Sequence, residues 1–349
     1  MTATKQEIQK LEELYSGRTP YHGELHDHAA SGGTSDGKCT LAFWKEEMAR
    51  QQMDFAAILD HRQVRHMYQP EWEDGLFLGG SEPGGTLTDI GAKHPKFHYN
   101  LLTEGPEQLM ELLEEFPEYQ FSGGREGHFC YPAFTKERLG ELITALKSKG
   151  GFFVHPHPKQ VMVSEDPLDY CFQDETGLEV FYNDNRSEYT PANYRLWCAL
   201  LAAGRRIWAC AGCDYHRGPE TTALTTIYAE EKTNRAYLSH LRKGDFICGP
   251  IGIRMAIGNT LMGGQGAFNG QKLLFSVGDF HPHHVREGHE YRVYLYNDEG
   301  FITSRIIDPH TTNYFAFETK PCNFYRVEVF DQTLKLRVAI GNPIWNIAE

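Results

Sequence analysis

Imidazole and carboxylate side chains recur beside the apolar segments that we predict to be strands. His26 and His28 are two residues apart in an extended segment, so both rings point to the same side and can bind one metal ion. The same residue types border other apolar segments, at Asp36, Asp60, His61, Glu82, His98, His155, His157, Asp214 and His216. Imidazole and carboxylate bind borderline and hard divalent metals without any thiolate. The pattern therefore predicts a divalent-metal site.

The elements that must position these residues alternate between strands and helices up to about residue 245. Apolar runs predict strands at 54–59, 152–154, 178–181 and 207–211. Helical spacing of apolar residues predicts helices at 41–52, 109–116, 135–150 and 191–204. This alternation favours parallel βα units, hence an α/β barrel or a doubly wound sheet. In such barrels functional groups gather at the C-terminal ends of the strands, because the loops there converge.

The pattern changes after Gly249-Pro250. Alternating apolar and polar runs, separated by turn residues, occur at 273–277, 291–296, 325–329 and 336–338. Runs of this kind predict a small antiparallel β-sandwich domain. We therefore predict two domains, a metal-dependent hydrolase barrel over residues 1–250 and a β-sandwich over residues 251–349.

Charge and composition argue against several other classes of protein. The chain has 349 residues and a formal net charge of −13. It has no run of Lys and Arg, so we expect no nucleic-acid partner. Its first twenty residues are too polar for a signal peptide, and no run of 18 apolar residues occurs, so we expect a cytoplasmic protein without membrane contact. The eight irregularly spaced cysteines do not predict a disulfide framework.

Several short motifs resemble those of the PHP (polymerase and histidinol phosphatase) superfamily. They are Leu25-His26-Asp27-His28, Ser35-Asp36-Gly37, Leu59-Asp60-His61, Gly150-Gly151 with His157-Pro158, and Cys213-Asp214-Tyr215-His216-Arg217. The resemblance covers about residues 20–218. It implies a distorted (β/α)7 TIM-like barrel with two or three divalent metal ions, which can be Mn, Zn or Fe. The two-domain layout resembles a branch of that superfamily with a C-terminal β domain.

The resemblance also implies which residues bind each ion. The first ion is assigned to His26, His28, Glu82 and Asp214, the second to Glu82, His98 and His157, and the third to Asp36, His61 and His216. Two departures from the motifs are visible. Extra residues at 29–34 precede Ser35-Asp36, and the third motif reads His-Pro-His-Pro, so that His155 and His157 compete. The spacing from Gly150-Gly151 favours His157.

A metal centre with a shared carboxylate predicts hydrolysis by a metal-activated hydroxide. Two ions in such a centre can bind both the attacking and the leaving oxygen of an in-line displacement. Phosphoryl oxygens also need cationic partners, and a planar guanidinium binds phosphate in a bidentate way. The catalytic cations that we expect are Arg217, Arg186, Arg125 and Lys159. We expect Asp27 and Asp60 to orient imidazoles rather than to bind metal.

These features predict a metal-dependent hydrolase, foremost a phosphoesterase that cleaves a small phosphorylated metabolite. The alternative is a hydrolase that uses the same ions on a carboxylic ester, a carbamate or a glycoside. Arginines that face the metals would favour phosphate, whereas a pocket of Tyr, Trp and Asn would favour a neutral substrate. A third class is a binding or scaffold protein with a degenerate site. Such a site normally lacks some of the metal ligands, whereas this sequence retains them. The oligomeric state stays open.

Overall fold

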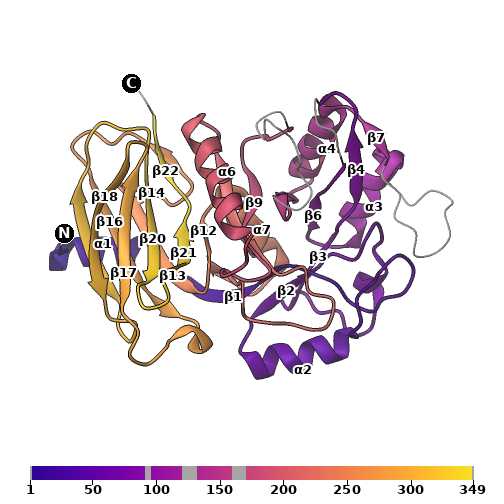
Figure 1. The fold of residues 1–349 in the computed structure, drawn as a ribbon, viewed down its shortest axis with the longest axis horizontal. Helices are drawn as coiled ribbons and strands as arrows, with labels where there is room; N and C mark the ends of the chain where they lie inside the picture. The colour runs from indigo at the N-terminus through magenta and orange to yellow at the C-terminus, as the bar shows by residue number, and fades with distance from the viewer. Residues whose placement is uncertain (1, 91–95, 120–131, 159–169, 348–349) are drawn as a thin grey trace.

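The computed structural model describes residues 2–90, 96–119, 132–158 and 170–347, which form three sheets flanked by helices (Figure 1). Most of the candidate ligands lie in the segments that follow strands of the longest sheet. Its first nine strands have the order β10 (Ile207–Gly212), β9 (Thr176–Tyr182), β8 (Phe152–His155), β6 (Asn100–Thr103), β3 (Phe77–Ser81), β2 (Phe55–Ile58), β1 (Thr19–Asp27), β11 (Thr225–Ala229) and β12 (Phe246–Cys248). A small separate sheet contains β5 (Lys96–His98), β4 (Gly84–Leu87) and β7 (Ala133–Phe134).

The predicted barrel does not close in the described part of the chain, which corrects that expectation to a mixed α/β fold with a large central sheet. Strands β1, β2 and β3 are parallel, as are β8, β9 and β10, but β6 is antiparallel to both of its neighbours. Parallel neighbours need a long crossover, usually a helix. The chain between β3 and β6 instead forms the short strands β4 and β5. At the open edge, an isolated bridge between Asp27 and Tyr215 links the end of β1 to the segment after β10.

Six α-helices are described: α1 (Lys5–Leu14), α2 (Leu41–Gln51), α3 (Pro106–Glu115), α4 (Lys136–Ser148), α6 (Thr190–Ala202) and α7 (Asn234–Lys243). Short 3-10 helices occur at Arg65–Tyr68, Pro117–Tyr119 and Pro282–His284. The side chains of Thr40 and Thr135 accept hydrogen bonds from the first turns of α2 and α4, as expected for N-caps. The four predicted helices are confirmed by α2, α3, α4 and α6.

The C-terminal strands form two layers, at the left of Figure 1, and all of their pairs are antiparallel except the short parallel pair β15 and β22. One layer contains β14 (Thr260–Leu261), β13 (Ile251–Ile257), β16 (Lys272–Phe280) and β19 (Asn313–Glu318). The other contains β21 (Leu336–Gly341), β20 (Phe324–Asp331), β17 (Tyr291–Asn297) and β18 (Gly300–Ile307), with β22 (Ile344–Asn346) and β15 (Gln265–Gly266) beside them. Apolar side chains from both layers, such as Phe275 and Val293, meet in one core.

The N-terminal and C-terminal halves share elements. β12 pairs with β21, so the long sheet runs on into the C-terminal layer. Leu11 and Tyr15, in and just after α1, are buried in the core of the C-terminal strands. The domain boundary at residue 250 stays a prediction. In the described ranges, no helix combines the length and the apolar character that crossing a bilayer requires.

Candidate metal centre

The nine predicted metal ligands lie together at the ends of strands. Their ligand atoms form three groups, namely His26, His28, Glu82 and Asp214; Glu82, His98 and His157; and His28, Asp36, His61 and His216. Within each group the ligand atoms lie within 4.8 Å of one another. Glu82 and His28 each belong to two groups, so the three groups adjoin.

The first group surrounds the carboxylate of Glu82, which follows β3 and is buried. Its Oε2 atom lies 3.3 Å from Nε2 of His26 and 3.2 Å from Nε2 of His28. Asp214 Oδ1 lies 3.1 Å from the same nitrogen of His28 and 3.5 Å from that of His26. Two imidazoles and two carboxylates are thus close enough to bind one ion.

Glu179, in the middle of β9, fixes the orientation of His26. Its Oε1 accepts a hydrogen bond from Nδ1 of His26 at 2.7 Å, so the lone pair of Nε2 faces Glu82. Its Oε2 accepts a hydrogen bond from the backbone N–H of His157 at 2.7 Å. Gly212 on the neighbouring strand leaves the space for this side chain, because a Cβ there would lie 2.4 Å from Glu179 Oε1. Carboxylates that orient a ligating imidazole in this way raise its affinity for metal.

Backbone carbonyls orient two further imidazoles. His61 donates through Nδ1 to the carbonyl of Glu82 at 3.0 Å, and His216 donates through Nδ1 to the carbonyl of Asp214 at 2.8 Å. A carbonyl can only accept, so in both rings the proton is on Nδ1 and Nε2 has the lone pair. Both Nε2 atoms face Asp36 Oδ1, at 3.6 Å for His61 and 3.0 Å for His216.

The second group separates the two competing histidines of the His-Pro-His-Pro motif. Glu82 Oε1 lies 2.8 Å from Nδ1 of His98 and 3.0 Å from Nε2 of His157. The ring of His155 instead lies against Phe153 and Phe172, with centroids 4.8 and 4.7 Å away. Burial there lowers the pKa of His155 to about 3. His157 therefore faces the cluster and His155 lies in the apolar core.

Two of the candidate ligands have a left-handed backbone conformation, which glycine adopts most readily. His157 has φ of 30° and Asp214 has φ of 56°. Non-glycine residues in the left-handed region cost free energy and cluster at functional sites. Backbone hydrogen bonds hold both residues in this conformation. The N–H of His157 donates to Glu179, and the N–H of Asp214 donates to the carbonyl of His26 at 2.7 Å.

Opposite charges dominate the electrostatics of the centre. Burial alone would lower the pKa of His26, but the nearby carboxylates, led by Glu82, raise it well above its usual value. Burial alone would raise the pKa of Glu82, yet His26, His98 and His61 hold it well below its usual range. The pKa of Asp214 is lowered in the same way. The carboxylates are therefore ionised at neutral pH and favour cations between them.

The donor set fits divalent metal ions. Among the described residues, His26 Nε2, Glu82 Oε2 and Asp36 Oδ1 are buried without a hydrogen-bond partner. Buried polar atoms without partners are rare and costly in native proteins, and a bound ion would satisfy all three. Imidazole with carboxylate suits Mn, Fe and Zn. Two or three ions stay our prediction for their number.

The two aspartates expected to orient imidazoles differ. Asp60 lies 4.0 Å from Nδ1 of His28 and 3.4 Å from Nδ1 of His66, and it accepts hydrogen bonds from Ala29 N–H and from the Ser31 hydroxyl. Asp27 is also buried, but its carboxylate makes no ion pair with a described imidazole. Its burial, together with the nearby Glu24, raises its pKa well above the usual value.

The two predicted catalytic cations that the structure describes, Arg186 and Arg217, line other pockets. The guanidinium of Arg186 pairs with Asp184 at 2.7 Å and lines a pocket that none of the nine ligands lines. Arg217 is exposed and lines a surface pocket with Phe43 and Arg50. Arg125 and Lys159 lie outside the described residues. A catalytic role for these four side chains stays a prediction.

Sequence reasoning missed two residues beside the ligands. Glu179 is one, and Tyr182 at the end of β9 is the other, since its hydroxyl donates to Asp214 Oδ2 at 3.0 Å. A usable signal existed for Glu179. It is a carboxylate inside an apolar strand, and buried carboxylates are almost always paired.

Of the comparisons with known proteins, the search of solved structures found similar proteins. No family model matches the chain, and a search of curated proteins finds no match. A novel lesion-specific endonuclease from Pyrococcus furiosus is similar in structure, with 15% identity and a TM-score of 0.43. Endonuclease Q in complex with a 27-mer duplex that has an abasic lesion at the active site is also similar, with 15% identity and a TM-score of 0.41. The matches cover 64% of this chain and 56% and 57% of those chains, little more than half their length.

These findings correct two expectations. The similar structures are those of endonucleases, and one contains duplex DNA. We therefore withdraw both the small phosphorylated metabolite as substrate and the exclusion of nucleic acid as partner. At this identity and TM-score, the similarity does not by itself assign a substrate to the chain.

Proposed function

We propose that the chain is a metal-dependent hydrolase and that phosphodiesters are its substrate class. The observation that supports this most is that three groups of imidazole and carboxylate ligands are linked by Glu82 and His28, each of which belongs to two of the groups. Neighbouring divalent ions in such a cluster act as Lewis acids on phosphoryl oxygens and lower the pKa of water. Glu82, His28, His98 and His157 would bind these ions.

The residues around the ligands give the centre its rigidity. Glu179 keeps Nε2 of His26 directed at Glu82, and Tyr182 keeps Asp214 in place by donating to its Oδ2. His26 and Glu82 are almost completely buried, so their charges act in a medium of low dielectric constant. Preorganised groups of this kind need little rearrangement when a charged transition state forms.

The placement of Arg186 and Arg217 favours a diester over a monoester. A phosphodiester has one negative charge at neutral pH, whereas a monoester has nearly two. Arg186 is bound to Asp184 and Arg217 lies on the surface, so neither supplies the extra charge that a monoester requires. Metal ions would then neutralise most of the charge of the substrate.

The same placement of the arginines supports a second candidate. A hydrolase of a carboxylic ester, a carbamate or a glycoside would use the same ligands and would not need guanidinium groups. Tyr182, at the edge of the cluster, fits the hydrogen bonding of a neutral substrate.

The test is an assay of protein loaded with Mn, Fe or Zn. We expect metal-dependent hydrolysis of bis(p-nitrophenyl) phosphate, and an oligonucleotide duplex tests nucleic acid as a substrate. The double variant His26→Ala/His28→Ala should lose bound metal and activity but retain its circular dichroism spectrum, since only ligands are removed. A matched control replaces two exposed histidines, His283 and His310, with alanine.

Two outcomes would overturn the proposal. Activity that survives in the His26→Ala/His28→Ala variant would show that the site is elsewhere. Hydrolysis of p-nitrophenyl acetate without hydrolysis of any phosphodiester, with metal bound, would favour the second candidate instead.

A further inference from the structure

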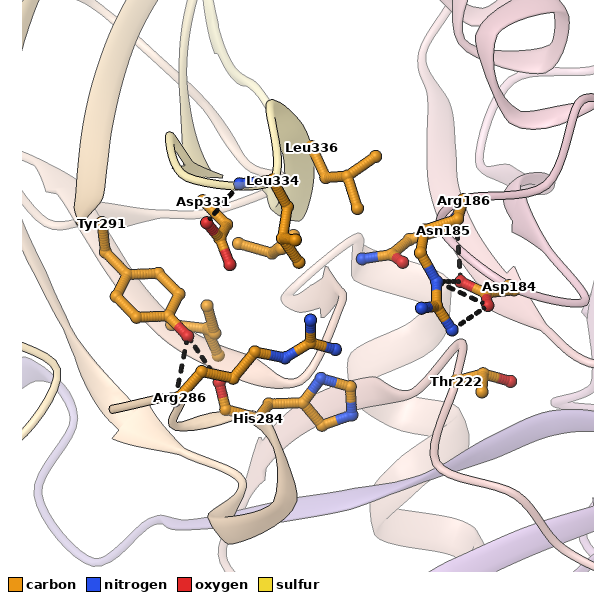
Figure 2. A pocket seen from close by; sticks show the side chains of 12 residues that line it. Asp184, Asn185, Arg186, Thr222, His284, Arg286, Tyr291, Asp331, Leu334 and Leu336 are labelled. Carbon is orange, nitrogen blue, oxygen red and sulfur yellow. Dashed lines mark hydrogen bonds and ion pairs between the residues drawn. The ribbon is translucent and has the colours of Figure 1, made fainter. Parts of the chain in front are cut away.

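A second pocket lies between the β9–α6 connection and the C-terminal strands (Figure 2). It is a small pocket that is partly open to solvent. Its lining residues are Asp184, Asn185, Arg186, Thr222, Ile251, His284, Arg286, Tyr291, Asp331, Leu334, Leu336 and Val338. None of the nine candidate metal ligands is among them, so this junction pocket is a separate site.

Both carboxylates of the junction pocket already have partners. Asp184 accepts hydrogen bonds from Nε and from a terminal nitrogen of Arg186, at 2.9 and 2.7 Å (Figure 2). Asp331 is buried and pairs with Nδ1 of His289 at 2.7 Å, while its other oxygen accepts from Leu334 N–H at 2.9 Å. Neither carboxylate is therefore available to a cation in the pocket.

Arg286 supplies a cation that is not neutralised. In the described part of the chain, no carboxylate lies within ion-pair distance of its guanidinium, although its backbone N–H donates to the hydroxyl of Tyr291 at 3.2 Å. Figure 2 shows the guanidinium extending into the pocket above the ring of His284. A half-buried guanidinium without a counter-ion favours an anion, and its planar fork matches a carboxylate or a phosphate.

His284 does not add a second charge. Its Nε2 donates to the carbonyl of Thr221, and burial lowers its pKa to about 4, so the ring is neutral at pH 7. Among the described lining residues, Arg286 is therefore the cation that has no carboxylate within ion-pair distance, and it suits a ligand with an anionic group.

The opposite wall of the junction pocket is apolar. It contains Leu334, Leu336, Val338 and Ile251, and Figure 2 shows Leu334 beside Asp331, whose carboxylate accepts a hydrogen bond from the backbone N–H of Leu334. Leu334 is 37% exposed although it is a large aliphatic residue. Aliphatic groups of a ligand would bury apolar surface there, which favours binding.

We propose that the junction pocket binds a small organic anion, with its carboxylate or phosphate on Arg286 and a short aliphatic chain against Leu334 and Leu336. The small size of the pocket suits a chain of a few carbons. The site neighbours the metal centre along the chain. Tyr182, which donates to Asp214, is separated by one residue from Asp184 in the pocket wall.

The experiment is calorimetric titration of the metal-loaded protein with butyrate, butyl phosphate and, as a neutral match, butyramide. We expect one of the two anions to bind and butyramide not to bind. Arg286→Gln should weaken binding roughly tenfold or more, because a charge-assisted hydrogen bond is lost. Arg305→Gln, which removes an exposed guanidinium from β18, should leave binding unchanged.

A second variant tests the apolar wall. Leu334→Ala, in an exposed turn, should weaken binding of butyrate or butyl phosphate more than binding of acetate or methyl phosphate. The comparison between the two anions decides whether the ligand class is carboxylate or phosphate. Equal binding by Arg286→Gln and the unsubstituted protein would overturn the proposal, because the anion would then be at another site such as the metal centre. Absence of binding by both anions would also overturn it.

Discussion

At the scale of single residues, ligands and non-ligands of the same type differ in their partners. His26 and His155 are both buried, but only His26 faces carboxylates, and their pKa values move in opposite directions as a result. Glu179 is the clearest case of a residue that acts through another, because both of its oxygens hold candidate ligands.

Glu179→Gln should therefore lower metal affinity without removing a ligand. An amide is a weaker acceptor for the Nδ1–H of His26 and can present its own donor instead, so the orientation of the ring is less fixed. We expect metal affinity to fall roughly 10- to 100-fold, measured by competition with a chelator. Glu188→Gln, a change at an exposed glutamate, is the matched control. Unchanged affinity in the Glu179 variant would refute the positioning role.

At the scale of elements, strand β1 contains both a candidate metal ligand and a buried histidine that affects the stability of the fold. Its C-terminal end has His26, while His22 lies four residues earlier in a different environment. Nδ1 of His22 lies 2.9 Å from the hydroxyl of Thr226 on β11, and its ring contacts that of His281 at 5.4 Å. Burial, aided by the neighbouring His281 and His284, lowers the pKa of His22 to about 3.

This pKa predicts how stability depends on pH. The unfolded chain takes up a proton on His22 near pH 6.5, whereas the folded chain resists it down to about 3. The neutral ring therefore favours folding above pH 6.5, and this contribution is lost as the pH falls from 6.5 to about 3. Chemical unfolding at several pH values should show a smaller acid-induced loss of stability for His22→Gln than for the unsubstituted protein. His310→Gln, at an exposed position, should retain the original slope.

At the scale of the whole molecule, a buried charge cluster joins α6 to the C-terminal strands. Glu328 on β20 has no exposed surface and accepts a hydrogen bond from Tyr194 on α6 at 2.8 Å. It also pairs with Arg337 at 2.7 Å and with Arg326 at 3.3 Å. One carboxylate thus compensates two guanidinium groups where the two halves of the molecule meet.

Glu328→Gln should be strongly destabilising, because it leaves both arginines without a buried counter-charge. Removal of one partner from a buried ion pair costs about 3–5 kcal/mol of unfolding free energy. Urea unfolding followed by circular dichroism measures this loss, and metal content at low urea should not change. Glu299→Gln, at an exposed turn position, should have little effect. A loss below about 1 kcal/mol in Glu328→Gln would show that the cluster does not couple the halves.

The sequence by itself determined features that depend on local spacing. Helices α2 and α4 follow from their Thr caps and apolar stripes, and the clustering of imidazole and carboxylate at strand ends indicated metal chemistry. Motif resemblance supplied the grouping around Glu82. All of these depend on neighbours in the chain or on residue type.

Only the tertiary structure decided the features that depend on distant contacts. The direction of β6, and with it the open edge of the sheet, follows from long-range pairing that local pattern does not encode. The position of Glu179 between His26 and His157, and the distance of Arg186 from the cluster, depend on how separate strands pack. A side chain takes its role from the charges and space around it, and residues far apart in the sequence supply these.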